Sequence, residues 1–108
     1  MKNGIYSLIF RSDGEDFGGG ILVVKDDLVN GGDSIYSYKG FIEEDRLILN
    51  LAKHNMDSHS LFGNLGVLKL NLVFHDDTQG YILKGNIENI QTVPLLVYAK
   101  FIGDLIEL

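Results

Sequence analysis

Apolar and polar positions alternate with a period of two in nearly every apolar segment of the chain. β-branched and aromatic residues dominate these segments and helical periodicity is hard to find, so the pattern predicts strands. The expected strands cover residues 4–11, 17–25, 28–30, 34–42, 46–53, about 68–74, about 81–87 and 92–102. In the first of them, Tyr6, Leu8 and Phe10 share one face, while Ile5 and Ile9 lie on the other.

Short polar segments separate the expected strands. Asp26 and Asp27 form a plausible two-residue hairpin tip, and residues 43–45 and 75–80 form further turns. Pro94, the only proline, stands near the start of the last strand, where a missing N–H is tolerated. The longest irregular segment, residues 54–66, has room for one helical turn or a covering loop. Short sequential strands without crossover helices predict a mostly β fold, a small antiparallel up-and-down β-barrel with at most one short helix.

The last strand is unusual because both of its alternating sets are apolar. One set comprises Val93, Leu95, Val97, Ala99 and Phe101, and the other comprises Leu96, Tyr98 and Ile102. A barrel strand needs only one apolar face, so something should cover the second set. The irregular segment is one candidate, and a second copy of the protein is the other. We expect the second copy, which assigns Leu96, Tyr98 and Ile102 to a homodimer interface.

Length and composition indicate one folded domain over residues 1–108, with 45% hydrophobic residues. The formal net charge is -6 and the nine basic residues are scattered singly, which argues against direct nucleic-acid binding and favours a basic protein partner. The absence of cysteine excludes disulfides, thiolate zinc sites and cysteine nucleophiles, and fits a reducing compartment. Neither a signal-peptide core nor a stretch of roughly 20 apolar residues is present, so we expect a soluble cytoplasmic protein with no membrane partner.

The glycine-rich stretches do not predict a nucleotide site. A phosphate-binding loop lies between a strand and a helix, whereas strands follow both "FGGGILVV" and "NGGD". Positive φ angles, bulges or sharp bends explain these glycines better. Asp33, at the end of "NGGD", is expected to be a hydrogen-bond acceptor that stabilises a turn.

Two groups of histidines and carboxylates are weak candidates for chemistry. His54, Asp57 and His59 form one group, and His75, Asp76 and Asp77 form the other, but neither follows a known metal-ligand spacing. Ser58 and Ser60 flank His59 without a nucleophile elbow. We therefore assign no catalytic residue, no metal ligand and no cofactor. An enzyme that uses the region from His54 to His75 remains a residual alternative.

Two further features leave alternatives open. Glu43, Glu44 and Asp45 concentrate negative charge at a hairpin tip, which is either a solvated turn or a surface that receives a basic partner. The inward faces consist of Leu, Ile, Phe and Tyr, which fill a solid core or enclose an apolar small ligand. The second possibility is an alternative function, that of a carrier or sensor.

Several segments together resemble the GrlR-type negative regulators of bacterial type III secretion. They are "NGIYSLIF", "GGGILVVKDDLVNGGDSIYSYKG", "HN" at residues 54–55 and "VYAKFI" near the end, and they span nearly the whole chain. The resemblance implies a lipocalin-like or fatty-acid-binding-protein-like barrel that forms homodimers and acts by protein contact. The family's best-known member sequesters a helix-turn-helix transcription activator and carries a functional acidic run on an exposed loop.

In this chain the corresponding place holds Glu43, Glu44 and Asp45, followed by Arg46. The resemblance therefore implies a non-catalytic regulator that binds a protein partner, a transcription activator, with these three residues in the partner-binding site.

Overall fold

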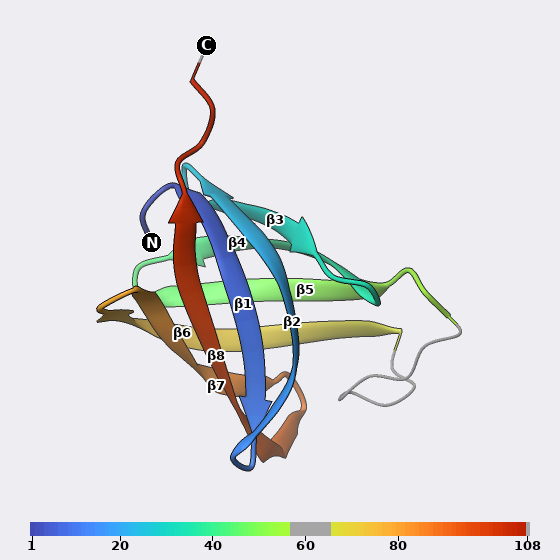
Figure 1. The fold of residues 1–108 in the computed structure, drawn as a ribbon. Helices are drawn as coiled ribbons and strands as arrows, with labels where there is room; N and C mark the ends of the chain where they lie inside the picture. The colour runs from blue at the N-terminus through green and yellow to red at the C-terminus, as the bar shows by residue number, and fades with distance from the viewer. Residues whose placement is uncertain (57–65, 108) are drawn as a thin grey trace.

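A computed structural model describes residues 1–56 and 66–107, which form a closed barrel of eight antiparallel strands. The strands are β1 Gly4–Ser12, β2 Glu15–Lys25, β3 Leu28–Gly32, β4 Tyr36–Glu43, β5 Arg46–Lys53, β6 Val67–Asp77, β7 Gly80–Ile87 and β8 Ile90–Gly103. Each strand pairs with the next, and β8 pairs with β1 to close the barrel (Figure 1). No helix occurs within the described ranges. The structure confirms the predicted up-and-down β-barrel.

The hairpin turns follow the predicted chemistry. Asp26 and Asp27 have φ angles of 52° and 65°, and Asp13 and Gly14 have φ angles of 52° and 80°. Two successive residues with positive φ make a turn whose twist matches that of the flanking strands. Aspartate tolerates this region better than most residues, which explains why these two-residue turns close without an Asn-Gly pair.

The predicted turn over residues 75–80 is wrong in extent. His75, Asp76 and Asp77 continue β6 and pair with Ile82, Tyr81 and Gly80 of β7. Only residues 78 and 79 turn the chain. Charged residues disfavour strands locally, but here their side chains are exposed and the backbone ladder of β7 is available, so pairing overrides local preference. Within the irregular segment, residues 57–65 lie outside the described part, so the covering-loop alternative stays a prediction.

The core consists of the inward faces of the strands. Tyr6, Leu8 and Phe10 are buried, as the alternation in β1 predicted. The largest fully buried side chains are Tyr6, Tyr36, Tyr38, Leu22, Leu47, Leu49, Leu51, Leu70, Leu72, Leu83, Val24 and Val29. Leu22, Leu51 and Leu70 have 0% exposure, so no water-sized space adjoins them. Side chains fill the barrel at these positions.

Strand β8 places its two apolar sets as expected. Leu95, Val97 and Ala99 are buried, whereas Ile102 on the other face is 52% exposed. The side chain of Val93 lies outside the described set. The register with β7 jumps from Gly85↔Leu95 to Ile87↔Ile90, so Pro94 lies in an irregular stretch of the ladder. This agrees with the predicted tolerance for its missing N–H.

Because the barrel is a meander, alternate turns come to the same end. The β2–β3, β4–β5 and β6–β7 turns gather at the end where both termini lie (Figure 1). The β1–β2, β3–β4 and β7–β8 connections gather at the opposite end.

Candidate functional site

One end of the barrel gathers acidic residues from all three of its turns. We call this end, with the β2–β3, β4–β5 and β6–β7 turns and the last residues of the chain, the acidic end. Its nine acidic residues are Asp26, Asp27, Glu43, Glu44, Asp45, Asp76, Asp77, Asp104 and Glu107. Its four basic side chains are Lys2, Lys25, Arg46 and Lys100. The local excess of negative charge is therefore larger than any single turn supplies.

The three acidic residues predicted from sequence all lie at this end and are exposed. Glu43 ends β4 and pairs with Arg46, and Glu44 and Asp45 form the two-residue turn between them. Asp26–Asp27 and Asp76–Asp77, which the sequence pattern did not group with them, lie at the same end. The signal that could have found them is the meander itself, in which every second turn returns to one end.

Backbone hydrogen bonds hold the acidic turns against the barrel. The amide of Ile42 donates to the carbonyl of Asp27 at 2.8 Å, and the amide of Phe74 donates to the carbonyl of Asp45 at 2.9 Å. These bonds connect the β2–β3 turn to β4 and the β4–β5 turn to β6. The acidic side chains thus project from a fixed backbone, so a partner meets them without ordering a loop.

The mouth of the barrel at the acidic end is lined with aromatic rings. Tyr6 lies 5.5 Å from Phe101 and 5.9 Å from Tyr81, and Tyr81 lies 5.7 Å from Phe74, centroid to centroid. The N-terminal segment lies across these rings. The Nζ atom of Lys2 is 4.1 Å from the centroid of Phe101, and the amide of Lys2 donates to Tyr81 Oη at 2.9 Å.

The same mouth forms an open hollow of about 510 Å³, with Asp76, Asp77, Lys2 and Lys100 among its lining residues. Burial raises the pKa of Tyr6 well above its ordinary value, and the neighbouring Tyr81 raises it further. The Tyr6 phenol therefore stays protonated at neutral pH and donates to the Lys2 carbonyl. These contacts tie the N-terminal segment to the barrel mouth.

The opposite end contains a partly buried polar network around Asp33. Its Oδ1 accepts hydrogen bonds from the amides of Ile35 and Tyr36, both at 2.7 Å, and its Oδ2 accepts one from Tyr38 Oη. Burial, then the bond to Asp33, raises the pKa of Tyr38 well above its ordinary value. His54 Nε2 lies 2.8 Å from the Asp33 carbonyl. The expectation that Asp33 stabilises a turn is confirmed.

The two described histidines, His54 and His75, do not lie at one site. His54 follows β5 at the end opposite to the acidic end, whereas His75 lies eight residues along β6 from Val67. At about 3.3 Å per residue, Val67 and His75 are roughly 25 Å apart along β6. No group of three or more metal-ligating side chains occurs in residues 1–56 and 66–107. Asp57, Ser58, His59 and Ser60 lie outside the described residues.

Two of the three predicted dimer residues, Leu96 and Tyr98, belong to a wider apolar surface on the outside of the barrel. Tyr98 and Leu96 are half-buried, and Tyr98 pairs with Ile9 of β1 and with Ile82 of β7. Ile9 and Ile21 are each 43% exposed. We call these outward apolar residues the β8 surface: Ile82 of β7, Leu96 and Tyr98 of β8, Ile9 of β1 and Ile21 of β2. Ile102 lies beyond Lys100, next to a register shift, and is set apart from Tyr98.

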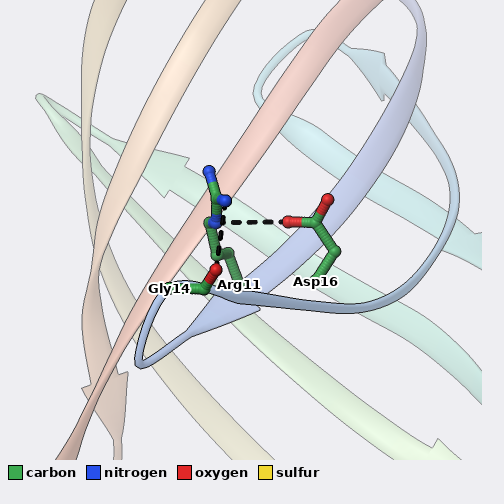
Figure 2. A network of polar contacts seen from close by, with 3 residues as sticks. All are labelled: Arg11, Gly14 and Asp16. Atoms are coloured by element: carbon green, nitrogen blue, oxygen red, sulfur yellow. Dashed lines mark hydrogen bonds and ion pairs between the residues drawn. The ribbon is translucent and has the colours of Figure 1, made fainter.

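A polar corner where β1 meets β2 has a structural role. Arg11 Nη2 donates to the Gly14 carbonyl at 3.1 Å, and Arg11 Nε lies 3.3 Å from Asp16 Oδ1 without hydrogen-bond geometry (Figure 2). Both side chains of the ion pair are partly exposed, so it contributes little to stability. The contacts tie the β1–β2 turn to its own hairpin.

The geometry thus defines a filled eight-stranded antiparallel barrel with one acidic end and an apolar outer surface around β8. Comparison with protein-family models and with curated proteins gave no match to this chain. Among the described residues, no helix has the length and apolar character needed to cross a membrane.

Proposed function

We propose that the protein is a non-catalytic cytoplasmic regulator that binds a protein partner through its acidic end. The concentration of seven acidic residues at three backbone-anchored turns, with Asp104 and Glu107 in the segment after β8, supports this proposal. The resemblance to GrlR-type regulators supports a helix-turn-helix transcription activator as the partner and negative regulation of type III secretion as the role.

The charge of such a partner explains how binding would inhibit it. A DNA-binding helix-turn-helix domain needs a basic surface for the phosphate backbone. An acidic protein surface attracts the same basic surface and accelerates the encounter at low ionic strength. Occupation of that surface by the acidic end would exclude DNA, so no catalytic step is needed for inhibition.

The first experiment uses a triple variant in which Glu43, Glu44 and Asp45 are each replaced by alanine. Tagged protein captures its partner from host lysate, mass spectrometry identifies it, and association with the purified partner is followed at several salt concentrations. We expect association about tenfold slower at low salt and a shallower salt dependence, since three charges that steer the encounter are gone.

The matched control replaces Glu15, Asp16 and Glu88, which carry the same total charge at the opposite end. Its association rate should fall much less, because these groups lie far from the contact. Equal falls in the association rate of the two triple variants would show that net charge, and not its position at the acidic end, controls association. Unchanged association in the Glu43–Asp45 variant would remove the proposed site.

We further propose that the protein is a homodimer that buries the β8 surface. The partly exposed Ile9 and Ile21 and the half-buried Leu96 and Tyr98 support it, because exposed apolar groups on adjacent strands gain free energy from burial.

A carrier or sensor of an apolar small ligand is the second candidate function. The hollow of about 510 Å³ at the aromatic mouth favours it. The ligand would bind at this mouth, because side chains fill the interior around Leu22, Leu51 and Leu70. Native mass spectrometry of protein purified from its own host separates the two candidates. A co-purifying lipid favours the carrier, and a co-purifying helix-turn-helix protein favours the regulator.

A further inference from the structure

A second apolar feature lies on the outside of the barrel, across β3, β4 and β5. Leu28 pairs with Phe41, and Phe41 pairs with Ile48, so the three outward side chains stand side by side in one row. Leu28 is 61% exposed, Phe41 is 42% exposed and Ile48 is half-buried. We call Leu28, Phe41 and Ile48 the β4 row.

Charged groups border the β4 row asymmetrically. Toward the acidic end, the next outward residue of β4 is Glu43, and the Asp26–Asp27 turn is bonded to β4 through the amide of Ile42. Toward the opposite end, the next outward residue of β4 is Lys39, which pairs with Asn30 and Asn50. The row is thus acidic on one flank and weakly basic on the other.

Two basic residues also touch this border. Lys25 pairs with Leu28 across the β2–β3 hairpin, and Arg46 pairs with Glu43 across the β4–β5 hairpin. They leave an excess of negative charge on this flank, where five acidic residues of the two turns gather. These five are Asp26, Asp27, Glu43, Glu44 and Asp45.

The β4 row is accessible in the proposed dimer. Strand β4 is four strands away from β8 in either direction around the eight-stranded barrel, so the two lie on opposite sides. A dimer formed through the β8 surface therefore leaves a β4 row exposed on the outside of each protomer.

We propose that the β4 row is the apolar anchor of the partner site, and this inference rests on the proposed function. It accepts an amphipathic segment of the partner that carries one apolar stripe, with Lys or Arg on the flank facing the acidic turns. Three strands about 4.8 Å apart make a row roughly 10 Å wide, which matches the diameter of a helix. Charge steers the encounter, whereas burial of apolar side chains slows dissociation.

The test uses the full chain and two synthetic helical peptides of about 18 residues, long enough for roughly five turns. One has a leucine stripe bordered by lysine, and the other has the same composition with the leucines dispersed. Backbone amide chemical shifts map the binding site, and stopped-flow fluorescence gives the rates. We expect the patterned peptide to shift amides of β3, β4 and β5 and to bind about tenfold more tightly than its scrambled form.

The variant Leu28→Thr/Phe41→Thr introduces β-branched threonines, which suit strands, and removes the apolar anchor. We expect it to release the patterned peptide about tenfold faster with an unchanged salt dependence. Val67→Thr is the matched control, because Val67 is 74% exposed at the opposite end of the barrel. The shift map of the unmodified protein tests the site even where the double variant fails to fold.

The outcomes separate this inference from the proposed function. Equal affinity for the two peptides, shifts centred on other strands, or unchanged release from the double variant would overturn the anchor. In those cases, a loss of partner association on replacing Glu43, Glu44 and Asp45 would still support the acidic end. Unchanged partner association in that variant would overturn the proposed function itself.

Discussion

At the scale of single residues, Asp33 decides how the chain enters β4. Its carboxylate accepts two backbone amides and the Tyr38 phenol, and Tyr38 itself is 1% exposed. Strand β2, which lies beyond β3, must leave room for this contact. A Cβ atom at Gly20 would lie 2.5 Å from Tyr38 Oη, so a glycine here is required by close approach. The "GGD" stretch is therefore a structural element of the opposite end.

Substitution of Asp33 tests this assignment. Asp33→Ala leaves the buried Tyr38 phenol and two amides without their acceptor and should lower the free energy of unfolding by about 2–3 kcal/mol. Asp33→Asn keeps one carbonyl acceptor and should cost about half as much. Urea denaturation followed by circular dichroism measures both. Equal stabilities of Asp33→Ala and the unmodified protein would show that the network does not stabilise the fold.

At the scale of elements, two-residue hairpins set the register of the sheet. The β2–β3 turn places Lys25 opposite Leu28, and the pairing of β3 with β4 places Leu28 opposite Phe41. The same turn holds Asp26 and Asp27 at positive φ, where non-glycine residues carry a steric cost. Asn3 supports the turn, because the Asp26 amide donates to Asn3 Oδ1 at 2.9 Å. The hairpin therefore combines two exposed carboxylates with local backbone strain.

Relief of that strain should stabilise the protein. Asp27→Gly removes the Cβ contact at φ 65° and should raise the free energy of unfolding by about 0.5–1 kcal/mol. For a barrel of this size, that is a rise of roughly 3–6 °C in Tm, measurable by calorimetry. Asp27→Ala removes the same charge but keeps the strain, so it should not stabilise. A similar gain from both variants would assign the effect to charge repulsion instead.

At the scale of the whole molecule, closure of the sheet limits contacts with other molecules to the ends and the outer faces of the barrel. Pairing of β8 with β1 leaves no unpaired sheet edge between them, so edge-to-edge association through these strands is excluded. Further contacts must use the ends of the barrel or the outer faces. The acidic end, the β8 surface and the β4 row occupy three separate parts of this exterior.

The proposed dimer is tested by size-exclusion chromatography with light scattering. We expect a mass near twice the 12.0 kDa of the chain, and a monomer for the variant Ile9→Lys/Tyr98→Lys, because two ammonium groups cannot be buried without partners. Val67→Lys adds a lysine far from the β8 surface and should remain dimeric. A monomeric unmodified protein at micromolar concentration would remove the dimer.

The sequence by itself determined the strands, the inward faces and most turns. Period-two alternation fixes which side chains share a face, as for Tyr6, Leu8 and Phe10, and a two-residue tip such as Asp26–Asp27 fixes a hairpin. These are local properties, and the described strands agree with them. The extent of β6 was missed because His75, Asp76 and Asp77 form a strand only through pairing with β7.

Tertiary structure alone decided which surfaces combine. Glu43, Glu44 and Asp45 are visible in sequence as one acidic tip, but their grouping with Asp26–Asp27 and Asp76–Asp77 depends on the order and closure of the strands. The alignment of Leu28, Phe41 and Ile48 likewise depends on register across three strands. Such contacts join residues far apart in the chain, and the alternation within one strand does not give its register with the strands beside it.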